Sequence, residues 1–145
     1  MSVIRKSLVF AAVLLGFCVS TAHAQGMIIV KVPFPFVAGQ KTFPAGQYEI
    51  RGIDAGAVLA IRGISDPSSF GFLITNSLSG YDPAGDQPSL VFTRSLNEYR
   101  LTQIWNSTSE GRELPGVSAT QEDARADKQR GVPNAQTYVV AANWK

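Results

Sequence analysis

The sequence predicts a mainly β domain, a small antiparallel β-barrel or sandwich of about seven or eight strands with one C-terminal helix. Short segments in which apolar and polar residues alternate recur at intervals of roughly 8–14 residues. Turn residues separate these segments, and the chain of 145 residues holds 13 Gly and 8 Pro. The hydrophobic share of 45% is enough for a packed core, whereas the charged share of 17% disfavours long surface helices.

Residues 1–24 are predicted to be a signal peptide that is cleaved from the mature protein. Arg5 and Lys6 precede an apolar run at residues 8–19, and residues 22–24 read Ala-His-Ala, a small-x-small cleavage pattern. The apolar run is shorter than the roughly 20 residues that a membrane-spanning helix needs. We therefore expect an exported protein, periplasmic or secreted, with no transmembrane segment once the leader is removed.

The rest of the chain, residues 25–145, is expected to form a single domain. A lipid anchor on Cys18 is disfavoured because the bulky Phe17 precedes it. The lone Cys and the lone His, His23, both lie in the leader. Two of the 13 basic residues lie there as well, which leaves eleven basic and eleven acidic residues in the domain. A neutral domain without a basic run gives no electrostatic reason to expect nucleic acid as a partner.

A domain without Cys and His lacks several common chemistries. It has no disulfide, no thiol nucleophile and no imidazole for a Ser-His-Asp triad or a histidine-based metal site. The Ser-x-x-Lys and Gly-x-Ser-x-Gly patterns are absent, as are the glycine-rich nucleotide-binding patterns. We therefore expect no cofactor and no enzymatic activity.

Some weaker possibilities remain. Glu49, Glu98 and Glu113 lie on strand-like segments and are the candidates for a glycosidase carboxylate pair, although each has a simpler interpretation as a solvated side chain. The loop Asp82–Asp86 could offer two carboxylates to Ca²⁺, but it lacks the spacing of an EF-hand and resembles an ordinary turn. Asn106 begins an Asn-x-Thr triplet of a kind that arises often by chance.

The first predicted strand covers residues 28–37. A spacing of two residues along an extended strand puts four apolar side chains on one face, namely Val30, Val32, Phe34 and Phe36. Pro33 and Pro35 occupy the other face and cannot donate to a ladder, so an edge strand or a partly paired strand is expected. After a Phe-Pro-Ala-Gly turn, Tyr48 and Ile50 are expected to face inward, with Glu49 and Arg51 facing outward.

Further strands follow at residues 57–61 and 70–75, and the second of these places Phe70, Phe72 and Ile74 on one side. Residues 90–95 and 99–105 predict a hairpin. On its second strand four side chains are expected to share a face, namely Tyr99, Leu101, Gln103 and Trp105, while Ile104 points the other way.

A helix is expected at about residues 119–130. Ser118 and Gln121 form a capping-box pattern before it, and Gly131 with Pro133 would end it. The competing interpretation is a disordered charged segment. A final strand at about residues 136–141 would return to the sheet.

Two blocks of sequence carry a resemblance to a known family. Residues 32–50 read VPFPFVAGQKTFPAGQYEI, and LVF at residues 90–92 is followed by YRLTQIW at residues 99–105 and GRELP at residues 111–115. Over about residues 28–115 the chain resembles an uncharacterised family of small secreted bacterial β-proteins. The resemblance implies a β fold and export, and it implies no activity and no catalytic residues. The second Pro of the first block departs from the pattern, which bears on how fully the first strand pairs.

The candidate functional residues are few. Arg112 and Glu113 form either a salt bridge that pins the chain after the hairpin or a binding pair. Six aromatic residues are candidates for the core or for the lining of an internal cavity: Phe34, Phe36, Tyr48, Phe72, Phe92 and Trp105.

The function expected from these observations is that of an exported, non-enzymatic β-domain that binds an envelope or extracellular partner or has a structural role in the cell envelope. A small carrier with an apolar barrel cavity is the main alternative, and a carboxylate-based glycan hydrolase is the weaker one.

Overall fold

The computed structural model describes residues 26–53, 56–95, 98–115 and 136–145, and within these ranges it is mainly β. The strands are β1 (Met27–Val32), β2 (Phe36–Ala38), β3 (Lys41–Phe43), β4 (Gly46–Ile53), β5 (Val58–Gly63), β6 (Phe70–Ile74), β7 (Asn76–Ser79), β8 (Ser89–Ser95), β9 (Glu98–Trp105), β10 (Glu110–Glu113) and β11 (Gln136–Trp144). The predicted leader and the predicted helix at residues 119–130 lie outside the described residues. No helix in the described ranges has the length and apolar character needed to cross a membrane.

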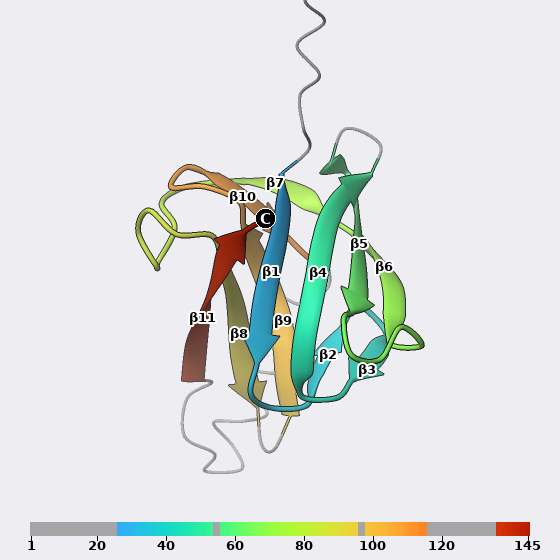
Figure 1. Ribbon diagram of the computed structural model, residues 1–145. Helices are drawn as coiled ribbons and strands as arrows, with labels where there is room; N and C mark the ends of the chain where they lie inside the picture. The colour runs from blue at the N-terminus through green and yellow to red at the C-terminus, as the bar shows by residue number, and fades with distance from the viewer. Residues whose placement is uncertain (1–25, 54–55, 96–97, 116–135) are drawn as a thin grey trace, which may run out of the picture.

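The strands form one strongly curved sheet that nearly closes into a barrel (Figure 1). Its order is β3-β2-β9-β8-β11-β1-β4-β5-β6, and β10 pairs with both β9 and β7. The two end strands are bridged where Lys41 Nζ donates to the Phe70 carbonyl at 2.7 Å. The prediction of an antiparallel barrel-like fold is confirmed in this coarse form. Two details differ: the described sheet has eleven strands because several are very short, and β2 runs parallel to β9.

The run predicted as one first strand is divided by its prolines. β1 ends at Val32, and β2 begins at Phe36, beyond Pro33 and Pro35. Because proline has no N–H to give to a ladder, pairing stops there and the chain crosses to another part of the sheet. β1 itself is not an edge strand, because it pairs with β4 on one side and with β11 on the other.

The core lies inside the curve of the sheet, and four aromatic rings fill its centre. Phe36 contacts Phe43, Tyr48 and Phe92 with ring centroids 5.3–5.4 Å apart. These four side chains are almost fully buried, as are Val30 and Val32 among others. Phe34 is partly buried and packs on this core, with its ring stacked on that of Tyr99 at 3.8 Å. The predicted inward positions of Phe34, Phe36, Tyr48 and Phe92 are therefore found in the structure.

The prediction that Phe72 belongs to the core is wrong. Phe72 is 63% exposed, and Phe70 and Ile74 share its outward face, while Leu73 of the same strand is buried. The inner face of β6 has little room, because a Cβ on Gly71 would lie 3.1 Å from the Phe43 ring. The interior beside Gly71, where Phe70 and Phe72 would otherwise pack, is already occupied by the Phe43 ring from β3.

Trp105 is buried, but it does not face the main core as predicted. A bulge shifts the register between β8 and β9, so that Val91 pairs with Gln103 whereas Phe92 pairs with Leu101. The extra residue reverses the alternation, and Leu101 and Ile104 both enter the core. Trp105 therefore lies on the opposite face of β9, outside the core cluster.

Glycines make room for the Trp105 indole on that face. Gly111 of β10 pairs directly with Trp105, and a Cβ at Gly111 would lie 2.8–2.9 Å from three atoms of the ring. A Cβ at Gly80 would lie 3.3 Å from the same ring. Beside Trp105 on β8, Ser89 donates from Oγ to the Asp82 carboxylate at 2.6 Å and is fully buried.

Candidate functional site

Arg112 and Glu113 are consecutive residues of β10 and therefore face opposite sides of the sheet. Arg112 donates from Nη1 to the Ser77 hydroxyl of β7 at 3.2 Å, and its guanidinium lies against Gly56, in the turn between β4 and β5. No ion pair joins Arg112 to Glu113 in the described part of the chain. The structure thus places Arg112 as a link between β10, β7 and a neighbouring turn.

The three candidate catalytic carboxylates are not brought together. Glu49 lies on β4, whereas Glu98 lies at the start of β9, four strands away along the sheet. Glu113 pairs across to Gln103, toward the other end of β9 from Glu98. Glu98 forms an ion pair with its near neighbour Arg100. Each of Glu49 and Glu98 therefore has a local basic partner.

The Asp82–Asp86 loop uses its first carboxylate to hold its own shape. Asp82 Oδ1 accepts hydrogen bonds from the Ala84 N–H at 2.8 Å and from the Ser89 hydroxyl at 2.6 Å. Asp86 instead accepts from the Thr108 hydroxyl at 3.4 Å. Across the ranges that the structure describes, no three metal-ligating side chains of the His, Cys, Asp or Glu type come together.

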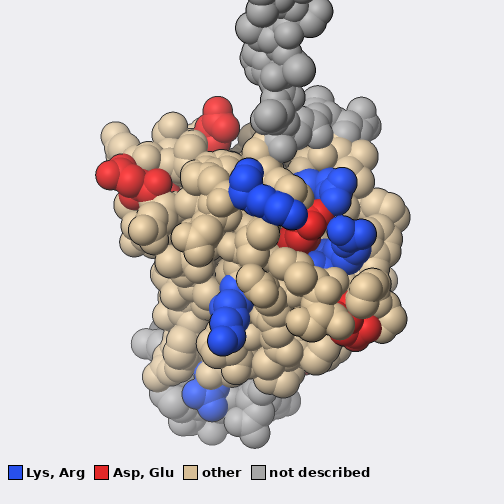
Figure 2. All heavy atoms as spheres, viewed as in Figure 1, with Lys and Arg blue, Asp and Glu red and all other residues tan. Residues whose placement is uncertain are grey.

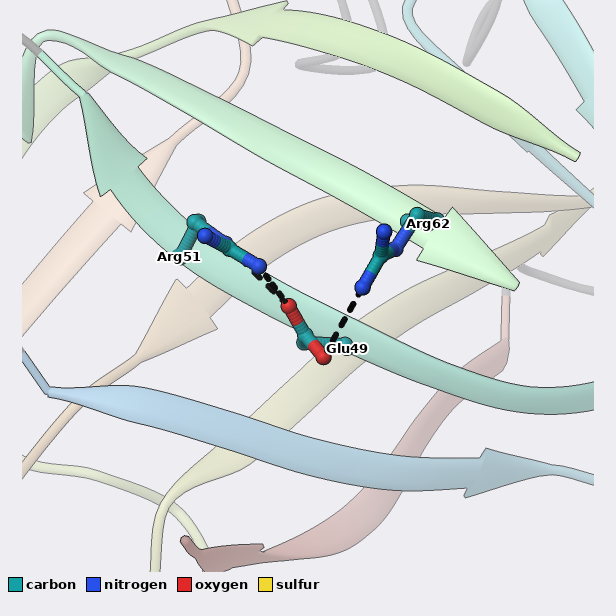
Figure 3. Close-up of polar contacts among 3 residues, drawn as sticks. All are labelled: Glu49, Arg51 and Arg62. Atoms are coloured by element: carbon teal, nitrogen blue, oxygen red, sulfur yellow. Dashed lines mark hydrogen bonds and ion pairs between the residues drawn. The ribbon is translucent and has the colours of Figure 1, made fainter. Parts of the chain in front are cut away.

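A compact charged cluster lies on the outer face of β4 and β5, and Figure 3 shows its three members, Glu49, Arg51 and Arg62. Arg51 donates to Glu49 Oε1 from both Nε, at 3.1 Å, and Nη2. Arg62 of β5, which is the cross-strand neighbour of Glu49, places Nη2 3.5 Å from Oε2. The two arginines cover the carboxylate, whose side chain is only 8% exposed, while their own side chains are 52% and 51% exposed.

The surroundings of Glu49 favour its charged form. The hydrogen bond from Arg51 is the main cause that lowers the pKa of Glu49 below its ordinary value of 4.5. The charges of Arg51, Arg62 and Lys145 act in the same direction, and burial opposes them. Glu49 is therefore an ionised group that fixes two arginines in place. It is not placed or tuned as a general acid.

An exposed apolar surface adjoins the charged cluster, and we call it the apolar row. Its members lie on the outer face of β4, β5 and β6: the exposed Ile53, Phe70, Phe72 and Ile74, and the half-buried Val58. The register places Ile53 beside Val58, Val58 beside Ile74, and Phe70 beside Arg62. The Phe70 and Phe72 rings contact each other edge to face, with centroids 4.8 Å apart.

The apolar row and the charged cluster together form what we call the β4–β6 face. Large exposed apolar side chains elsewhere in the described structure, such as Tyr81 and Val139, lie apart from it on other segments. Contiguous exposed apolar surface beside charged groups is typical of interaction sites, whereas scattered apolar side chains are normal.

Sequence reasoning missed this face. The alternation in residues 48–51 and 70–75 contained the signal, because it grouped Glu49 with Arg51 and Phe70 with Phe72 and Ile74. It predicted the outward direction of Glu49 and Arg51, but it did not show that Phe70, Phe72 and Ile74 also face outward or that β5 lies between the two groups. Comparison with protein-family models, with curated proteins and with solved structures gives no match to this chain.

Proposed function

We propose that this protein is an exported, non-enzymatic β-domain that binds a partner in the cell envelope through the β4–β6 face. The observation that carries the proposal is the apolar row, in which Phe72 and Ile74 are 63% and 70% exposed beside two ordered arginines. Burial of either side chain against a partner would stabilise the complex by up to about 1.5–3 kcal/mol.

Export is part of the proposal, and it is supported by the leader-like pattern of residues 1–24. Membership of the family of small secreted bacterial β-proteins that the chain resembles is likewise part of it. A binding role also agrees with the interior of the described sheet. The contacts of Phe36 with Phe43, Tyr48 and Phe92 occupy the centre of the barrel, where a carried ligand would have to lie.

The binding role is tested by retention on envelope membranes. The full chain is expressed with its leader in a Gram-negative host, and washed envelope fragments are separated from soluble protein. We expect the unaltered protein and the control Tyr81→Ser to sediment with the envelope, and the double variant Phe72→Ser/Ile74→Ser to remain soluble. Tyr81 is a matched control because it is 84% exposed and lies away from the face.

Circular dichroism of each variant establishes that it is folded before its distribution is compared. Equal retention of folded double variant and folded control would refute binding through this face. The intact mass of the exported protein tests the leader separately, because removal of residues 1–24 gives a chain that begins at Gln25 and lacks Cys18.

A further inference from the structure

The β4–β6 face and the adjoining β1 carry a local excess of positive charge. Figure 2 shows basic side chains gathered around one acidic side chain on the face formed by β1, β4 and β5, with the other visible acidic side chains toward the margins of the molecule. The exposed cations of this surface are Lys31, Arg51, Arg62 and Lys145. Among the described residues, the acidic ones beside them are Glu49, which the arginines cover, and Asp66, whose carboxylate accepts from Ser68 and Ser69.

The cations are positioned to meet a partner. Arg51 and Arg62 keep about half of their side-chain surface in solvent, while the carboxylate that orders them is nearly inaccessible. Lys145 is close enough to Glu49 to lower the pKa of its carboxyl group. An approaching molecule therefore meets guanidinium and ammonium groups before it meets the acid. Guanidinium groups held in a fixed orientation are suited to phosphate oxygens.

We propose that this face docks onto an anionic lipid surface, with Phe72 and Ile74 entering the interfacial region and Arg51, Arg62 and Lys145 contacting lipid phosphates. This inference rests on the proposed function and names its partner. Peripheral proteins bind lipid through buried apolar area together with attraction of basic groups to anionic headgroups. The face offers both, on strands that lie side by side in one sheet.

Charge complementarity favours a lipid surface over a second copy of the chain. Two copies joined through the same face would bring Arg51, Arg62 and Lys145 of one close to those of the other, and like charges at an interface are costly. A bilayer rich in phosphatidylglycerol supplies negative charge at every point of contact. The hydrated headgroup region also leaves water available for the backbone groups at the outer edge of β6, which among the described strands pairs only with β5.

The test is binding of the exported full chain to vesicles. One set contains equal parts of phosphatidylglycerol and phosphatidylcholine, and the other contains phosphatidylcholine alone. We expect sedimentation with the anionic vesicles, at least about tenfold weaker binding to the neutral ones, and a marked fall in binding as salt is raised from 0.1 to 1 M, since screening shortens the Debye length from about 10 to about 3 Å. All variants share the same N-terminus, so differences between them report on the face.

Two matched pairs of variants separate the contributions. Phe72→Ser should weaken binding to anionic vesicles about tenfold or more, whereas Tyr81→Ser should leave it unchanged. Arg62→Gln should weaken it about fivefold. Arg100→Gln is the control, because Arg100 is also paired with one glutamate but lies on β9. In Arg62→Gln, Glu49 can keep its hydrogen bonds from Arg51, so we expect the variant to fold.

Equal binding to the two vesicle types, or equal binding by Phe72→Ser and Tyr81→Ser, would overturn the lipid inference. So would a stable dimer in light scattering that Phe72→Ser dissociates, since the face would then join two copies. Binding to an acidic peptide such as polyglutamate without binding to vesicles would identify a protein partner instead. If the protein does not bind the vesicles but its retention on envelope fragments still requires Phe72 and Ile74, the lipid inference is wrong and the proposed function is supported.

Discussion

Substitution of Gly111 by alanine should destabilise the protein through a single added methyl group. In the structure that Cβ would meet three atoms of the Trp105 ring at 2.8–2.9 Å, where ordinary contact begins at about 3.4 Å. The ring would have to move by roughly half an ångström in a close-packed region. It has little freedom to do so, because Gly80 approaches the ring and the indole N–H donates to Gln103 at 3.1 Å.

The expected cost follows from these contacts. Overpacking of this kind costs about 1–3 kcal/mol. The change from glycine to alanine also lowers the conformational entropy of the unfolded chain, which stabilises the folded state by about 0.4–1 kcal/mol. A net loss of about 1–2 kcal/mol should remain, which for a domain of this size lowers the melting temperature by several degrees. Urea denaturation followed by tryptophan fluorescence measures it directly.

The matched control is Gly46→Ala. Gly46 lies on β4 without a positive φ, and a Cβ there would meet Tyr48 at an ordinary 3.7 Å. We expect Gly46→Ala to change the free energy of unfolding by less than about 1 kcal/mol. If Gly111→Ala proves as stable as Gly46→Ala, the packing of Trp105 against β10 described above is incorrect.

The remaining predictions concern the core and two titrating groups. Phe92→Ala should lower the free energy of unfolding by about 3–5 kcal/mol and Phe72→Ala by less than about 1 kcal/mol, as measured by urea denaturation, and similar losses would contradict their assigned faces. Burial raises the pKa of Tyr48 above 10.0, so the folded state holds that proton more tightly. Its contribution to stability is therefore present below pH 10 and lost as the pH rises through the raised value, and Tyr48→Phe should show a smaller alkaline decline. The lowered pKa of Glu49 gives the opposite pH dependence. The stability that Glu49 contributes is present above pH 4.5 and is lost as the pH falls through the folded-state pKa. Glu49→Gln should therefore be less stable than the unaltered protein at pH 7, with a difference that shrinks below pH 4.5, and a difference independent of pH would refute the role given to the carboxylate.

Alternation predicted the strands well because it depends only on local geometry. The side chains that it grouped on β1 and β2 (Val30, Val32 and Phe36) and on β4 (Tyr48 and Ile50) all face the core and are buried as expected. Alternation divides a strand into two sets, but it does not say which set faces the core. For β6 the set with larger side chains faces solvent, because the interior beside Gly71 is occupied by Phe43, which comes from another strand.

Trp105 was misplaced for a different reason. A bulge of one residue at Thr102 reverses the faces of everything after it. Thr102 is held there by bonds that the local pattern does not reveal, namely its hydroxyl to the Val91 carbonyl and its own carbonyl to the Leu114 N–H. The β4–β6 face was missed because its charged and apolar members come from three strands whose register depends on the whole sheet.

The position of β11 has a consequence for the order in which the chain can fold. This strand, residues 136–144, lies between β1 and β8 in the middle of the sheet, and it pairs Ile28 with Trp144. Contacts so distant in sequence form slowly. Until residue 144 has emerged from the ribosome, the facing edges of β1 and β8 have no partner and the sheet is split in two. The two halves of the sheet can therefore be joined only after nearly the whole chain has been synthesised, because the strand that joins them is the last one.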